Sequence, residues 1–113
     1  MKKIFLLVVL FALIAFLGYE NYWKYFDEKK LAYDYLEPAS QKTVKSWKWA
    51  DVDEYTAEYT MEIWDKESEQ FIDINGMETL VVSFKTTDDG TLGPIDVYLD
   101  MKTTKVIGIG VRK

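Results

Sequence analysis

The run from Ile4 to Leu17 constrains this chain most, because its fourteen residues are drawn only from Ile, Phe, Leu, Val and Ala. A helix of a soluble domain packs one face on its core and repeats its apolar residues at steps of three and four. A segment that is apolar on every side, preceded by Met1, Lys2 and Lys3, is typical of membrane targeting. We therefore predict that residues 1–19 are a signal peptide or an uncleaved membrane anchor, outside the folded domain.

Two fates are open to this segment, cleavage by signal peptidase or retention as an anchor. Cleavage requires small residues at the last and third-last positions before the cut. Cuts after Ala15 and Gly18 place Leu13 and Phe16 at the third-last position. The uncharged run from Ile4 to Tyr19 spans about 24 Å as a helix, less than the roughly 30 Å hydrocarbon core. An aromatic belt follows it, comprising Tyr19, Tyr22, Trp23, Tyr25 and Phe26. We favour an uncleaved single-pass anchor, with secretion after signal cleavage as the alternative.

Charge and composition bound the remaining residues, 20–113. Lys2 and Lys3 favour a cytoplasmic N-terminus, so we expect this part outside the cell membrane. Its 94 residues suffice for one domain and carry 12 basic and 19 acidic side chains, a net charge of −7. Phosphate binding needs clustered Lys and Arg, so nucleic acid is not an expected partner. The chain has no cysteine, which excludes a disulfide framework. The expected partners are the membrane, through Ile4 to Leu17, and an envelope protein or peptide.

Helical periodicity continues after the apolar run. Residues spaced by four and three predict a juxtamembrane helix over residues 20–37, with a stripe at Tyr22, Phe26, Lys29, Tyr33 and Leu36. We expect the ammonium group of Lys29 to snorkel to solvent. Pro38 ends this helix by pushing Glu37 out of the helical region. Pro38 also opens a second predicted helix, from Ala39 to about Trp47.

From Asp51 onward the apolar period changes to two, which indicates β-strands. The predicted strands are 55–64, 70–74, 79–86, 95–100 and 105–111. Asn75-Gly76 predicts a type I′ hairpin, and Asp88 to Gly90 a loop. Gly108 and Gly110 within a strand predict a bulge or a close backbone approach.

This order of elements predicts an α+β fold. An antiparallel sheet with one apolar face must be covered, and the helical segment is the available cover. The inward-facing residues are expected to include Leu80, Val82, Phe84, Ile95, Val97 and Leu99. Residues 38–113 are therefore predicted to be a small α+β domain. In it, the helical segment packs on a four- or five-stranded antiparallel meander.

The last predicted hairpin resembles a known family. Its sequence VYLDMKTTKVIG, from Val97 to Gly108, is similar to the strand–turn–strand of PepSY-like domains, where V-x-V-D-x-x-T-G-K-V-x-G is usual. Thr104 stands at the position of the family's glycine. The resemblance implies a small extracytoplasmic module of Gram-positive bacteria, often membrane-tethered and without catalytic residues. Its family is associated with peptidase propeptides and peptidase inhibition, and the resemblance identifies no site residue.

Catalytic and metal chemistry find little support in the sequence. The chain has no His and no Cys, so the commonest general base, thiol nucleophiles and His/Cys metal sites are missing. Carboxylates that could hold Ca²⁺ are those of Asp51, Asp53 and Glu54, or of Asp88 and Asp89. We interpret them as solvated turn residues. The predictions are no enzyme, no cofactor and no metal site.

Trp47 and Trp49 are the candidate binding surface. In an extended chain, residues two apart face the same way, and two exposed indoles can stack on sugar rings or on a peptide. Alternatively, both rings fill the junction between helix and sheet, which we favour because large aromatics are usually needed inside a small domain. The predicted function is a non-enzymatic binding or regulatory module acting on a peptidase or another envelope protein. The alternative is a cell-wall or glycan-associated structural module that uses exposed aromatics.

Overall fold

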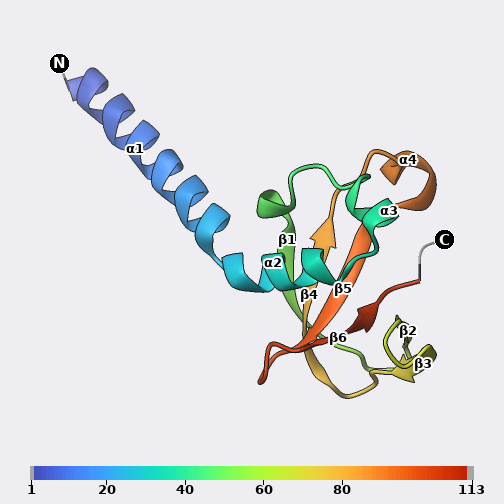
Figure 1. The fold of residues 1–113 in the computed structure, drawn as a ribbon. Coiled ribbons are helices and arrows are strands. Elements are labelled where there is room, and N and C mark those ends of the chain that lie inside the picture. The colour runs from blue at the N-terminus through green and yellow to red at the C-terminus, as the bar shows by residue number, and fades with distance from the viewer. Residues whose placement is uncertain (1, 112–113) are drawn as a thin grey trace.

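The computed structural model describes residues 2–111, in which helical segments precede and interrupt one six-stranded sheet (Figure 1). The helices are α1 (Lys2–Trp23), α2 (Phe26–Tyr35), α3 (Pro38–Gln41) and α4 (Asp89–Leu92), and η1 (Trp47–Trp49) is a 3₁₀ helix. The strands are β1 (Asp51–Thr56), β2 (Glu62–Asp65), β3 (Gln70–Asp73), β4 (Glu78–Phe84), β5 (Ile95–Asp100) and β6 (Val106–Ile109). The predicted α+β class is confirmed, with six strands where four or five were expected.

Helix α1 projects away from the rest of the molecule (Figure 1), which gives principal extents of 63 × 30 × 23 Å. Apolar side chains along it are exposed, among them those of Leu6, Phe11 and Ile14. The side chains of Tyr19 and Tyr22, from the predicted aromatic belt, lie outside the described residues. Within the part of the chain that is described, no helix combines the length and the apolar character needed to cross a membrane.

An elbow separates α1 from α2, so the prediction of one unbroken helix through residues 20–37 is wrong. Tyr25 at the elbow has φ 59° and ψ 29°, a left-handed conformation that costs a non-glycine residue about 1 kcal/mol. The bend lays α2 across the sheet (Figure 1). There it buries Ala32, Tyr35 and Leu36. Burial of this face offsets the cost of the elbow.

Strands β4 and β5 supply most of the core beneath α2. They pair antiparallel, with Leu80 opposite Leu99, Val82 opposite Val97 and Phe84 opposite Ile95. All six side chains are buried, in one cluster with the residues of α2. The inward-facing residues predicted for these two strands are therefore confirmed, as is the helical cover.

The predicted meander is wrong, because the sheet order is β1-β4-β5-β6-β2-β3. The expected strand 55–64 is two strands: β1 ends at Thr56 and pairs with β4, whereas β2 begins at Glu62 and pairs with β3 and β6. Alternation of apolar and polar residues reports which side chains are buried and not which strand lies alongside. One alternating run is therefore compatible with two strands in different places.

The predicted Asn75-Gly76 hairpin is also wrong. Gly76 has φ 80°, but Asn75 is not among the residues with positive φ, and a type I′ turn needs both. Instead, the Gly76 amide donates to the Ala57 carbonyl at 2.9 Å, and the chain crosses from β3 at one edge to β4 beside β1. Ala57 and Ile74 are buried here with Ile63 and Tyr98. Tyr98 alternates with Val97 and Leu99, so this second cluster lies on the face of the sheet away from α2.

The β5–β6 hairpin agrees with its prediction. Thr104, in its turn, has φ 58° and donates its amide to the Asp100 carbonyl at 2.8 Å. A Cβ at Gly108 would lie 2.6 Å from the Trp64 carbonyl oxygen, so the close approach predicted for this glycine is confirmed. A bulge shifts the register at Tyr98 and Leu99.

Two shorter elements differ from their predictions. The helix expected from Ala39 to Trp47 ends at Gln41, because Val44 forms a bridge with Thr86 and so extends the pairing of β4. The loop expected at Asp88 to Gly90 contains the short helix α4. At its start, Asp89 accepts a hydrogen bond from the Thr86 amide at 2.9 Å.

Candidate functional site

The two predicted site tryptophans lie in η1 and do not share a face. A 3₁₀ helix has three residues per turn, so residues two apart diverge. The Trp47 ring lies 5.8 Å from that of Tyr33 and 5.3 Å from that of Phe26, and it packs on the core cluster beneath α2. Trp49 is 55 % exposed. Trp47 therefore belongs to the core and Trp49 to the surface, so the favoured expectation that both rings fill the junction holds for Trp47 and is wrong for Trp49.

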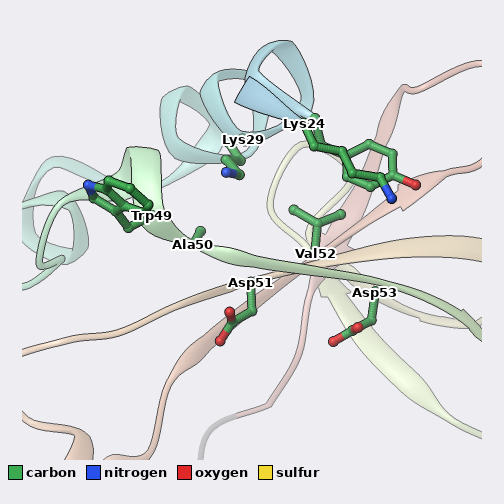
Figure 2. Close-up of a pocket in the computed structure, with 8 residues that line it drawn as sticks. Lys24, Lys29, Trp49, Ala50, Asp51, Val52 and Asp53 are labelled. Atoms are coloured by element: carbon green, nitrogen blue, oxygen red, sulfur yellow. The ribbon is translucent and has the colours of Figure 1, made fainter. Parts of the chain in front are cut away.

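Trp49 lines a pocket of about 260 Å³ between the elbow and the start of β1 (Figure 2). The elbow and α2 contribute Lys24, Tyr25 and Lys29 to its wall. The η1–β1 segment contributes Trp49, Ala50, Asp51, Val52 and Asp53. Because five consecutive residues form one wall, the pocket follows the edge of the strand.

Lys29 is the buried cation of this pocket. It is 2 % exposed, so the expectation that it snorkels to solvent is wrong. Its Nζ donates to the Lys48 carbonyl at 2.9 Å, which fastens η1 to α2. Burial lowers the pKa of Lys29 below its usual 10.5, and the charge of Asp51 opposes this shift.

At this pocket, successive side chains of β1 point to opposite sides of the sheet. Figure 2 shows Ala50 and Val52 on the side that faces α2, with Asp51 and Asp53 on the other side. Ala50 and Val52 belong to the core cluster beneath α2, whereas the two aspartates are exposed. The pocket therefore wraps around the strand edge and reaches both faces.

The outer edge of β1 has no strand beside it within residues 2–111. β1 stands first in the sheet order and pairs only with β4, from Asp51 opposite Ser83 to Thr56 opposite Glu78. At its far end lies a second hollow of about 450 Å³, lined by residues Tyr55, Thr56, Glu58, Tyr59, Thr60 and Met61. An edge strand presents backbone N–H and C=O groups that can pair with another chain. The site is thus a strand edge with a hollow at each end.

Other carboxylates serve the local backbone. Asp73 accepts hydrogen bonds from the amides of Met61 at 3.1 Å and Asn75 at 2.9 Å. Asp88 and Asp89 accept from the Thr86 hydroxyl at 2.6 and 2.7 Å. Among the described residues, no group of three or more His, Cys, Asp or Glu side chains is arranged to hold a metal ion.

Sequence reasoning missed the β1 edge and the buried Lys29. The segment from Asp51 to Glu54 has three acidic residues and no basic one, a composition that suits an exposed edge. Lys29 stood on the apolar stripe of its helix, which was the available signal for its burial.

Comparison with protein-family models, curated proteins and solved structures finds no match to this chain. Function is therefore inferred from the residues of this chain alone.

Proposed function

We propose that this chain is a non-enzymatic binding module, held at the outer face of the cell membrane by the run from Ile4 to Leu17. It binds an extended segment of an envelope protein, such as a peptidase, along the edge of β1. The observation that carries this proposal is the unpaired six-residue edge of β1 with a hollow at each end. Strand addition at such an edge is a common mode of peptide recognition, because backbone hydrogen bonds give affinity and flanking hollows take side chains.

The construction of the edge supports this mode of binding. Lys29, through its bond to the Lys48 carbonyl, and Trp47, through its ring contacts, hold η1 against α2. The start of β1 is thereby fixed before a partner arrives, which lowers the entropy cost of binding. The catalytic side chains that would favour an enzyme are scarce, since the chain has no His and no Cys.

The apolar run from Ile4 to Leu17 supports the proposed attachment to the membrane. Its described side chains are exposed, which is costly in water for Leu6, Phe11 and Ile14 together. The acidic domain, with its net charge of −7 after residue 19, is repelled by an anionic leaflet. These two properties favour a domain that is anchored by α1 and held off the lipid surface.

Site-specific photo-crosslinking in intact cells tests the proposal. A benzoyl-phenylalanine replaces Tyr55 on β1, which is 42 % exposed, or Phe71 on the opposite edge strand β3, which is 55 % exposed. We expect a discrete protein adduct from position 55 and none from position 71, because hollows lie at both ends of the β1 edge. Identical adducts from both positions, or none from position 55, would contradict docking at β1.

A glycan-binding role is the second candidate, and the pocket itself favours it. The exposed ring of Trp49 and the ring of Tyr25 lie in one pocket with the carboxylates of Asp51 and Asp53, a combination suited to stacking and hydroxyl recognition. Tryptophan fluorescence with peptidoglycan fragments tests this candidate. An emission that does not change on addition of the fragments would remove its support.

A further inference from the structure

The two sides of the β1 edge differ in charge where the pocket adjoins the start of the strand. Asp51 and Asp53 are exposed on the side away from α2, and because they are two residues apart their side chains are separated by about 7 Å along the strand. On the side that faces α2, the pocket presents Lys24 beside Val52 (Figure 2), whereas Lys29 is buried. The exposed Glu54 lies farther along the strand on the same side as Val52. A strand added here meets two anions on one face and, at the start of β1, one cation with apolar surface on the other.

This charge pattern disfavours a second copy of the chain as the occupant. When two β1 strands pair antiparallel over their full length, Asp53 of each copy lies opposite Glu54 of the other. Like charges directly across two strands are destabilising. The pattern instead favours a cationic strand.

We infer that the segment bound at β1 is a short extended peptide in which Lys or Arg alternates with apolar residues. This inference rests on the proposed function and names the chemistry of its partner. The basic side chains lie on the same face as Asp51 and Asp53, where opposite charges across two strands attract. The apolar side chains of the peptide lie against Val52, Tyr25 and Trp49. A Lys or Arg on this face of the peptide would be repelled by Lys24. The strand runs antiparallel to β1, as does every strand pair of the described sheet.

Three synthetic heptapeptides and the full chain test this inference. The peptides are Thr-Lys-Val-Lys-Val-Lys-Thr, its scramble Thr-Lys-Lys-Lys-Val-Val-Thr, and Thr-Glu-Val-Glu-Val-Glu-Thr. The ¹⁵N-labelled protein is held in phosphatidylcholine nanodiscs, whose uncharged surface does not attract the cationic peptides. We expect the alternating lysine peptide to shift the amide resonances of residues 51–56 and to slow their hydrogen exchange. The scramble should bind at least fivefold more weakly, and the glutamate peptide should leave the resonances unchanged.

A pair of double variants separates the β1 charges from the overall charge. Asp51→Asn with Asp53→Asn should weaken binding of the lysine peptide by about five- to tenfold, as expected for the loss of two exposed ion pairs. Glu62→Gln with Glu67→Gln removes the same charge from exposed positions in and after β2 and should leave the affinity unchanged. Equal losses in both double variants would reduce the effect to net charge and overturn the inference.

The outcomes also separate this inference from the proposed function. Two results would support docking at the β1 edge and contradict the alternating basic sequence. In one, the lysine and glutamate peptides bind β1 with equal affinity. In the other, the scrambled peptide binds as tightly as the alternating lysine peptide. If no peptide affects the amides of residues 51–56, both the inference and the proposed function are overturned.

Discussion

Single residues in this chain hold backbone conformations that their type disfavours. Thr104 has φ 58°, and a β-branched side chain is strained in this left-handed region. Glycine reaches this conformation without a steric cost.

Thr104→Gly should stabilise the protein by about 0.5 kcal/mol, because the cost of a left-handed non-glycine residue that it removes exceeds the freedom that glycine adds to the unfolded chain. Thr103→Gly is the matched control. Thr103 is not among the residues with positive φ, and its hydroxyl accepts a hydrogen bond from the Lys105 amide at 3.4 Å. Glycine there removes this bond and adds freedom to the unfolded chain, so it should destabilise by about 0.5–1 kcal/mol. Urea unfolding followed by circular dichroism measures both. A destabilised Thr104→Gly variant would refute the strain at this turn.

Tyr98 should make stability depend on pH above 10. Burial, assisted by the charge of Asp96, raises the pKa of Tyr98 to about 12 from its ordinary 10.0. Below pH 10 the phenol is protonated in both the folded and the unfolded state. Between pH 10 and 12 only the unfolded chain ionises the phenol, and this ionisation stabilises the unfolded state. The free energy of unfolding should therefore fall by about 3 kcal/mol across this window.

Tyr98→Phe isolates this contribution, because it keeps the buried ring and removes the ionisable group. Lys29 acts in the opposite sense, since its lowered pKa makes the free energy of unfolding rise with pH towards 10.5. The Tyr98→Phe variant retains Lys29, so this contribution is the same in both proteins. Wild type and variant should show the same pH dependence below pH 10 and diverge above it. Parallel curves up to pH 12 would show that Tyr98 does not titrate as inferred.

At the scale of elements, tertiary contacts place the helical segments. The rings of Trp23, Phe26, Trp47 and Tyr33 follow one another at centroid distances of 5.0, 5.3 and 5.8 Å, so they connect the end of α1 through η1 to α2. The hydroxyl of Tyr35 in α2 accepts a hydrogen bond from the Lys66 amide at 3.0 Å and donates one to Asp65 at 3.3 Å. This second link holds the β2–β3 turn against α2.

Trp47→Ala should destabilise the domain by about 2–4 kcal/mol, because it removes a packed ring between α2 and the sheet. Trp49→Ala is the matched control in the same 3₁₀ helix. Its ring is 55 % exposed, so the loss should stay below about 1 kcal/mol. Thermal unfolding of both variants measures the difference. Equal losses of stability in the two variants would contradict a core position for Trp47 and a surface position for Trp49.

At the scale of the whole molecule, the elongated shape separates an apolar helix from an acidic domain. We expect the chain to stay in the membrane fraction, with residues 20–113 digested when protease is added to intact cells. Mass spectrometry of the membrane fraction reports both topology and cleavage. A product in the medium that begins near Gly18 would make the protein secreted, and full protection of the domain would place it in the cytoplasm. Deletion of residues 1–19 is the control and should abolish both membrane retention and digestion.

The sequence by itself determined the local features of this protein. The β5–β6 hairpin, the inward faces of β4 and β5, and the close approach at Gly108 followed from alternation and glycine placement, which depend on neighbours along the chain. The α+β class followed as well, because a one-sided apolar sheet requires a helical cover.

Only the tertiary structure decided which strands lie side by side. The alternating run 55–64 did not specify that β1 pairs with β4 while β2 pairs with β6, since the burial pattern of a strand is the same beside any partner. The same choice of partners left β1 at the edge of the sheet. The elbow at Tyr25 and the bond from Lys29 to the Lys48 carbonyl then placed a pocket beside that edge. The candidate site is made by contacts between residues distant in sequence, and local periodicity does not encode such contacts.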